Sequence, residues 1–407
     1  MRKLIALTLL APAAALANGY SLPNTNPRDL ALADSAVAAQ GDAAATFKNP
    51  SALSKVEGLQ LSIGGSALFL DQTWTATTDD LRPQSPESLE FKPAPPVSFY
   101  AAYGREVLGM KAGVGVGMNL LGGANVFWDP HWAGRGRIIE VDRKVYGTFL
   151  TAGLQVLPQL RVGGGLMYAY TTEYLKQGVQ PFPDAYAEIS AQGGGVSYDV
   201  SAEYTPIAGY PLTFGLDYKH KTRMELKGDA HFNIPAGAVP TDPATVDQGA
   251  THVLTYPNTL NVGVAWRPVK PVQVTFGFTL DRYVVYKDDT FVGDRGFEVS
   301  VPRNYGNGHT FRLGAEWDTT ARLTLRGGIL RDVSGLKTDT YSPSLPDAST
   351  WAFAGGADWK FSDRLSVAAS IFWAPFDVVT STGSEAFPGK FDTNVLLPAI
   401  GLVWKPM

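Results

Sequence analysis

The side chains whose types and spacing best suit ligand binding lie in one short stretch. Phe127, Trp128 and Trp132 supply apolar and aromatic surface, and Arg135 follows closely. An exposed apolar cluster usually marks a binding surface, and a neighbouring guanidinium suits a hydrocarbon tail that ends in a carboxylate. The alternative is that Arg135 contacts lipopolysaccharide phosphates or acidic residues of the same loop.

Other positions extend this candidate site or offer a second one. Leu175 and Phe182 fall in or beside the next long connection and are expected to form another wall of the groove. Arg312, Glu316 and Arg326 are expected to point inward by strand alternation. We favour an interior ladder of salt bridges for these three, and a site for a ligand carboxylate is the alternative.

Catalytic and metal chemistry find no support in the sequence. The chain has 5 His and no Cys, the histidines do not have metal-ligand spacing, and no Gly-x-Ser-x-Gly elbow occurs. We therefore expect no enzymatic activity, no metal and no cofactor. Nucleic acid is not expected as a partner, because 34 Lys and Arg do not exceed 38 Asp and Glu.

The elements that must position these residues are β-strands. From residue 59 onward apolar residues alternate with small or polar ones, most clearly in 272–281, 310–317 and 323–330. This alternation is typical of strands with one apolar and one polar face. We count fourteen such segments, joined in turn by six short turns and seven long loops. That pattern predicts an outer-membrane barrel with both termini on the periplasmic side.

Tryptophan placement favours a membrane barrel over a large soluble all-β protein. Trp351 and Trp359 lie on one face of the same predicted strand, roughly 20 Å apart along the membrane normal. This separation matches aromatic girdles at the two edges of an apolar band. In the last strand we expect Ile400, Leu402 and Trp404 to face the lipid.

The N-terminal part of the chain differs from the rest. Residues 1–17 combine a basic pair, an apolar run and a small-residue cleavage site, which is typical of a secretory signal peptide. Residues 18–55 lack strand alternation and are too short for a core of their own. We expect them to pack on or inside a barrel built by residues 56–407. Pro50 should hold Asn49 extended where this N-terminal segment leads to the first strand.

Several segments resemble the FadL/TodX family of outer-membrane transporters for hydrophobic compounds. Residues 47–53, which read Phe-Lys-Asn-Pro-Ser-Ala-Leu, occupy the place of the motif that closes the family's hatch. Residues 132–135 are similar to its Trp-x-Gly-Arg motif, and 311–317 and 323–328 are similar to two of its late strands. The matches keep their order over residues 18–377.

The resemblance implies a 14-stranded antiparallel transmembrane β-barrel with a small N-terminal hatch in the bacterial outer membrane. It implies passive uptake of hydrophobic small molecules by outer-loop binding, hatch movement and sideways release, with long-chain fatty acids as the first expected substrate. It also implies an inward kink of the third strand, which Gly113, Gly115 and Gly117 would permit. Aromatic hydrocarbon uptake and a general diffusion porin are the alternatives. We expect a monomer whose partners are the substrate, outer-membrane lipid and lipopolysaccharide.

Overall fold

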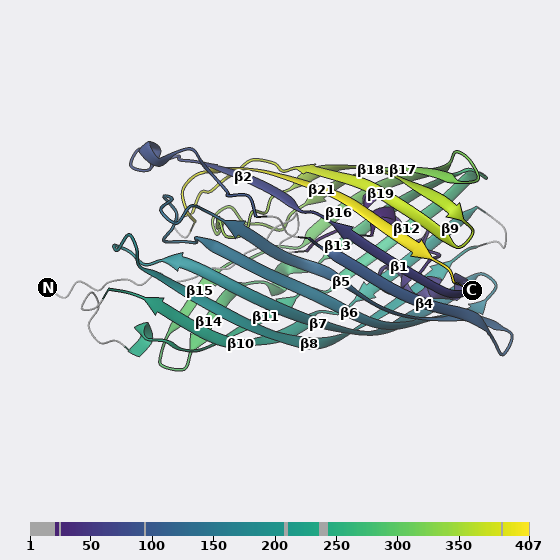
Figure 1. Cartoon of the computed structure of the whole chain (residues 1–407), viewed down its shortest axis with the longest axis horizontal. Coiled ribbons are helices and arrows are strands. Elements are labelled where there is room, and N and C mark those ends of the chain that lie inside the picture. Colours follow the sequence, from purple (N-terminus) through teal and green to yellow (C-terminus); the bar gives the residue numbers. More distant parts are fainter. Residues whose placement is uncertain are drawn as a thin grey trace.

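The chain forms one closed barrel. The computed structural model describes residues 21–23, 26–92, 95–206, 211–235, 243–383 and 386–406. The expected signal peptide, residues 1–17, and the first residues of the expected hatch lie outside these ranges. The sheet closes because β1 (Gly58–Ser66) pairs on one side with β4 (Val97–Val107) and on the other with β21 (Lys390–Trp404). Figure 1 shows the long barrel from the side.

Fourteen antiparallel strands make up the wall, which confirms the predicted fold. Some strands are interrupted and consist of two pieces each. These are β1 with β2 (Phe69–Thr75), β9 (Leu212–Lys219) with β10 (Thr222–Asn233), β11 (Gln248–Tyr256) with β12 (Thr259–Val269), β13 (Val272–Asp281) with β14 (Asp288–Gly293), and β15 (Glu298–Pro302) with β16 (Gly308–Asp318). The others are β4, β5 (Met110–Phe127), β6 (Glu140–Leu157), β7 (Leu160–Gly178), β8 (Tyr186–Tyr204), β17 (Leu323–Val333), β18 (Thr350–Ser362), β19 (Leu365–Pro375) and β21.

Short turns join the strands at one end of the barrel and long loops join them at the other. We call these the turn end and the loop end. Residues 108–109 and 363–364 are turns, whereas 128–139, 334–349 and 376–389 belong to loops. The short strands β3 (Glu87–Ser88) and β20 (Val379–Thr380) lie within the loop regions. The predicted alternation of short and long connections therefore holds for most of the strands, but at the loop end only residues 294–297 join β14 (Asp288–Gly293) to β15 (Glu298–Pro302).

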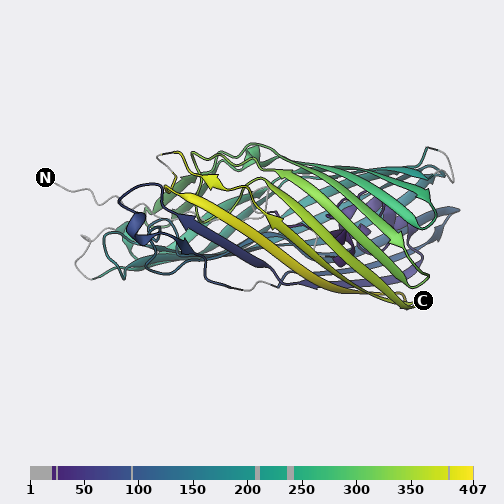
Figure 2. The same ribbon diagram turned by 90° about the horizontal axis from the view of Figure 1, so that it is seen from above.

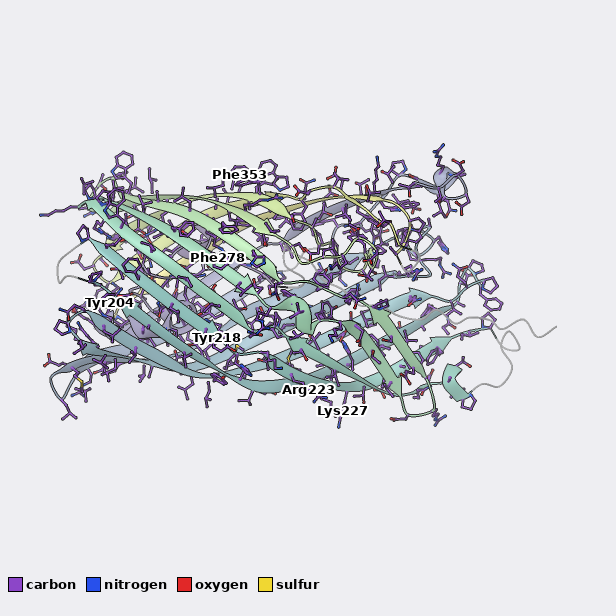
Figure 3. The ribbon with its side chains drawn as sticks, turned by 180° about the vertical axis from the view of Figure 1, so that it is seen from behind. Tyr204, Tyr218, Arg223, Lys227, Phe278 and Phe353 are labelled. Carbon is purple, nitrogen blue, oxygen red and sulfur yellow. The ribbon has the colours of Figure 1, made fainter. Side chains whose placement is uncertain are left out.

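The outside of the wall carries a lipid-facing band. Ile400, Leu402 and Trp404 are 63%, 36% and 45% exposed, which confirms the predicted facing of the last strand. In Figure 3, Tyr204 lies near the turn end, Tyr218, Phe278 and Phe353 share a level further along, and Arg223 and Lys227 lie beyond them. The change from aromatic to basic side chains marks the edge of the band toward the loop end. None of the helices in the described ranges is long and apolar enough to cross a membrane.

Several strands continue past this band further than the sequence predicts. The alternation of apolar and polar residues predicts that one strand ends near residue 171 and that another begins near 145, whereas β7 extends to Gly178 and β6 begins at Glu140. In these extensions the outward side chains are polar, as at Lys144 and Glu140. The contrast between an apolar and a polar face, on which the prediction depended, is lost there.

The hatch lies inside the barrel near the turn end, in purple in Figures 1 and 2. It contains α1 (Pro27–Ala31), α2 (Ala45–Lys48) and the 3-10 helix η1 (Pro50–Lys55). Asn26 caps α1, because its side-chain oxygen accepts a hydrogen bond from the Arg28 amide at 3.0 Å. α1 contacts β17 to β19 and β21, whereas η1 contacts β4 to β8. The segment therefore touches opposite sides of the wall.

Inward-facing glycines allow the hatch backbone to approach the wall closely. A Cβ at Gly153 would lie 2.2 Å from the Pro50 oxygen, and a Cβ at Gly113 would lie 2.2 Å from the Leu53 oxygen. Further wall glycines meet the hatch in the same way, namely Gly104, Gly163, Gly215, Gly314, Gly328 and Gly401. A methyl group at these positions would collide with the hatch. The hatch therefore contacts the barrel wall around most of its circumference.

Asn49 links separate segments of the hatch by hydrogen bonds and, through Ser51, connects them to the wall. It is fully buried and has φ −164° and ψ 90°, the extended conformation predicted before Pro50. Its Nδ2 donates to the Val37 oxygen at 2.9 Å, and its Oδ1 accepts from the Ser51 hydroxyl at 2.7 Å. The Ser51 amide in turn donates to the Ser201 hydroxyl of β8 at 2.9 Å.

Replacing Asn49 with alanine is expected to loosen the hatch. The substitution leaves a buried carbonyl and a buried hydroxyl without partners, at about 1–3 kcal/mol for each. Cells that make the variant should become more sensitive to large polar antibiotics, measured as inhibitory concentration. Asn233→Ala, at an exposed position of β10, is the matched control. Equal sensitivity of the two variants would contradict the proposed role.

The loop end is expected to face the outside of the cell. Positions 80 and 130 near the loop end and 320 at the turn end are all exposed, and the chain has no Cys. A cysteine at 80 or 130 should react with an impermeant maleimide on intact cells. A cysteine at 320 should react only after the outer membrane is permeabilised. The opposite labelling pattern would invert the topology.

Candidate functional site

A cavity of about 110 Å³ lies inside the barrel on the loop-end side of the hatch. Phe47 and Lys48 of α2 form its floor. Leu121 of β5 and Phe376 of the last long loop also line it. Hatch, wall and loops all contribute, so the cavity is the meeting point of the barrel's three parts.

One half of this cavity is apolar. Its lining side chains there are hydrocarbon or aromatic: Leu22, Phe47, Leu121, Met167, Leu330, Phe372, Ala374 and Phe376. Phe47 is held by Phe149, whose ring centroid lies 5.0 Å away. A concave apolar surface of this kind suits an alkyl chain or an aromatic ring.

The other half is polar and contains paired charges. Lys48 lies 2.6 Å from Asp34, so these two hatch residues form an ion pair. Lys219 of β9 lies 2.5 Å from Asp217 and 3.3 Å from Asp199, and its ammonium stands 4.8 Å above the Phe47 ring. Both lysines therefore already have carboxylate partners.

Arg312 faces this cavity, as predicted, but without the expected salt-bridge ladder. Its Nη1 donates to the Thr279 hydroxyl, and its Nε has no hydrogen-bond partner. Within the described parts of the chain no carboxylate lies close enough for an ion pair with Arg312. It is the predicted inward arginine that remains available to a ligand.

Arg326 belongs to the turn-end side of the hatch. Its Nε lies 2.6 Å from Glu316 Oε2, and the hatch residue Arg28 lies 3.5 Å from the same oxygen. Arg326 lines a second cavity of about 240 Å³ there. The predicted ladder is thus present for Arg326 and Glu316, where it fastens the hatch to the wall, but it does not include Arg312.

The third strand is irregular next to the main cavity. β5 pairs with β6 on both sides of a register shift between Leu120 and Gly122. Before the shift Gly117 and Asn119 face inward, and after it Ala124 and Val126 do. This change of parity is the signature of a β-bulge.

The predicted kink at Gly113, Gly115 and Gly117 is wrong in position. All three pair regularly with β4 and β6. Gly113 and Gly115 instead make room for Leu53 and Thr46 of the hatch. The irregularity lies at Leu121. A leucine does not indicate a β-bulge in the sequence.

The wall is incompletely paired beside this bulge. The ladder between β4 and β5 ends at the Ser98–Asn119 pair. Near the end of β5, the Phe127 oxygen accepts a backbone hydrogen bond from the Glu90 amide at 2.8 Å. In the described ranges the intervening edge of β5 has no β4 partner.

The N-terminal segment bonds to the bulge from inside the barrel. The Leu22 amide donates to the Leu121 oxygen at 2.9 Å, and Ser21 forms an antiparallel bridge with Gly122. The Tyr256 hydroxyl donates to the same Leu121 oxygen at 3.1 Å. The cavity, the bulge and the N-terminal segment are therefore in direct contact.

The predicted exposed cluster of the second long loop is buried, so that expectation is wrong. Trp128 and Trp132 are 0% and 1% exposed and stack with ring centroids 4.2 Å apart. Trp74 of β2 and Phe387 of the last long loop pack against Trp132. These rings form the core of a cap that covers the loop end.

Arg135 is also occupied by contacts within the protein. Its guanidinium donates to three backbone oxygens, those of Pro130 at 2.7 Å, Phe182 at 3.0 Å and Ala185 at 3.0 Å. It therefore joins its own loop to the next. Phe182 packs at the edge of the cap core, and Leu175 is fully buried on β7. Phe127 is half-buried at the end of β5. The main cavity is lined by none of the six residues predicted from this region, which are Phe127, Trp128, Trp132, Arg135, Leu175 and Phe182.

A buried charge cluster beyond the lipid-facing band was not predicted. Asp289 of β14 lies 2.8 Å from Arg303, 3.3 Å from His252 Nε2 and 3.6 Å from Arg143. Glu173 of β7 pairs with Arg143 and lies 2.8 Å from His252 Nδ1. Burial would raise the pKa of Asp289, but Arg303 and Arg143 hold it below its ordinary value. The cluster links β6, β7, β11 and β14 at the loop end.

A match to a family model identifies the family of this chain. A sequence profile described as "Outer membrane protein transport protein (OMPP1/FadL/TodX)" matches residues 8–395. The chain belongs to this family. It is therefore an outer-membrane transport protein, and the predicted resemblance is confirmed. Among curated protein sequences none matches this chain.

Solved structures show the same fold at low sequence identity. A Pseudomonas aeruginosa FadL homologue has a TM-score of 0.84 and 16% identity, with 95% of this chain and 99% of that chain covered. The Ralstonia pickettii toluene transporter TbuX has a TM-score of 0.70 and 17% identity, covering 94% and 99%. The P. putida toluene transporter TodX has a TM-score of 0.72 and 14% identity, covering 89% and 94%.

Proposed function

We propose that the transporter takes up hydrophobic small molecules passively and releases them sideways into the membrane. The substrate enters at the loop end and occupies the main cavity above the hatch. Leu121 carries this proposal, because it lines the cavity and also interrupts the pairing of the wall. An oily molecule that leaves there enters lipid directly and gains about 0.8 kcal/mol per buried CH₂.

Long-chain fatty acids are the substrates that we propose first. The cavity joins an apolar half to Arg312, so it can hold both ends of such a molecule. An aromatic hydrocarbon would use the apolar half alone and is the second candidate, because two of the similar structures are toluene transporters. We propose a monomer without catalytic activity, with both termini in the periplasm and outer-membrane lipid and lipopolysaccharide around it.

The outer-loop cluster is proposed to act on uptake indirectly. Trp128, Trp132 and Arg135 hold the loops together, and Phe127, Leu175 and Phe182 adjoin them. Their packing would set the shape of the entrance above the cavity. Movement of the N-terminal segment, which bonds to the bulge through Leu22, would then open the sideways exit.

Blocking the cavity tests this function. Ala374→Phe places a ring in the apolar half, and it should reduce uptake of a labelled fatty acid and of toluene. Ala369→Phe, an outward and exposed position on the same strand, should have no effect. Folding of both variants is checked by the heat-dependent shift on SDS gels. Full uptake by a correctly folded Ala374→Phe variant would refute the route, and high single-channel conductance of the native protein would favour a diffusion porin.

A further inference from the structure

The lining of the cavity has three acidic and three basic side chains, and two further carboxylates lie behind one of the bases. Its basic members are Lys48, Lys219 and Arg312, its acidic members are Asp34, Asp281 and Asp332, and the two carboxylates behind Lys219 are those of Asp199 and Asp217. Five acids thus stand against three bases, and Tyr256 is the remaining titratable group on the lining. A further negative charge would enter a cluster that already has an excess of carboxylates.

Arg312 is the base that a ligand could reach, and two buried carboxylates accompany it. Asp281 of β13 is 6% exposed and Asp332 of β17 is 5% exposed, and both line the cavity. Asp332 accepts a hydrogen bond from the Thr310 hydroxyl at 3.1 Å. Arg312 Nε, in contrast, has no acceptor. An arginine with an unpartnered donor therefore lines the same cavity as two carboxylates.

Asp281 retains an unused acceptor. One of its oxygens accepts from the Thr259 hydroxyl at 2.7 Å. Among the described residues nothing donates to the other oxygen. Because Asp281 lines the cavity, a ligand group with a hydrogen to donate could bond to this oxygen.

We infer, on the basis of the proposed function, that this site selects hydrophobic molecules with an uncharged head group that both donates and accepts hydrogen bonds. A primary amide, an alcohol or a protonated carboxylic acid meets this requirement, since it accepts from Arg312 and donates to Asp281. An ionised carboxylate can accept from Arg312 but has no hydrogen for Asp281, and it adds charge to an acidic cluster. Fatty acids would therefore bind as the neutral acid.

Matched eight-carbon ligands test the inference. Calorimetric titration of the purified native protein would compare octanamide with octanoic acid at pH 5.5 and at pH 7.5. Octanamide should bind equally well at both values. Octanoic acid should bind about tenfold more weakly for each pH unit above its own pKa, because only the protonated form is taken up. Octanoate that binds at pH 7.5 as tightly as octanamide would overturn the inference.

A substitution tests whether Asp281 itself, rather than the number of acidic residues in the barrel, weakens octanoate binding. Asp281→Asn should strengthen octanoate binding at pH 7.5 relative to octanamide binding by the same variant. Asp358→Asn, another buried aspartate on the turn-end side of the hatch, is the control and should match the native protein. Equal octanoate binding by both variants would contradict the assignment, and the native titration decides alone if Asp281→Asn does not fold. If neither ligand binds the native protein at either pH, the cavity is not the substrate site and the proposed function fails instead.

Discussion

A disulfide between positions 21 and 122 is expected to stop uptake. Ser21 and Gly122 form a β-bridge, and bridge partners lie roughly 4.5–5.5 Å apart between Cα atoms. This separation is within the range that a disulfide spans, and the chain has no Cys that could pair wrongly. The bond would fix the N-terminal segment against the bulge. Uptake by the oxidised protein should fall to that of cells without the transporter.

Reduction should restore uptake in the same sample. A control pair at Ala101 and Val116, which face each other in the regular ladder of β4 and β5, should leave transport unchanged when oxidised. If the oxidised 21–122 protein transports normally, the N-terminal segment does not move during release.

Asp289→Asn is expected to destabilise the loop end of the barrel strongly. Asp289 accepts from Arg303 Nε at 2.8 Å and from the Tyr286 hydroxyl at 2.5 Å, inside a cluster that excludes water. Without its charge, Arg303 loses the carboxylate that lies 2.8 Å from it, whereas Arg143 keeps that of Glu173. Breaking a buried pair by removing one partner costs about 3–5 kcal/mol.

The loss should appear as a lower temperature at which the folded barrel converts to the unfolded form on SDS gels. Asp288→Asn is the control, because the neighbouring Asp288 is exposed and faces the other side of β14. An equal shift for the two variants would show that the buried cluster contributes little to stability.

The wall was predictable because one physical contrast repeats along it. Lipid outside and a packed interior inside impose apolar and polar faces, as on the strand that ends with Ile400, Leu402 and Trp404. Where that contrast ends, so does the prediction. β7 continues to Gly178 beyond the lipid, and its last residues lack the alternation.

The site was less predictable because its members meet only through the closed barrel. Asp281, Arg312 and Asp332 lie on three different strands, and local sequence does not reveal which of their neighbours are already paired. Burial of Trp132 likewise depends on Trp74 of β2 and on Phe387 of the last long loop, which are distant in the sequence. The bulge at Leu121 arises where the N-terminal segment bonds to β5, a contact between residues far apart in the chain.

The position of a bound substrate tests the central claim most directly. An experimental structure of the protein soaked with octanamide would locate the ligand by its density. We predict elongated density in the main cavity, with the chain against Phe47 and Phe372 and the head group between Arg312 and Asp281. Density confined to the loop cap, or an empty cavity at saturating ligand, would contradict this account.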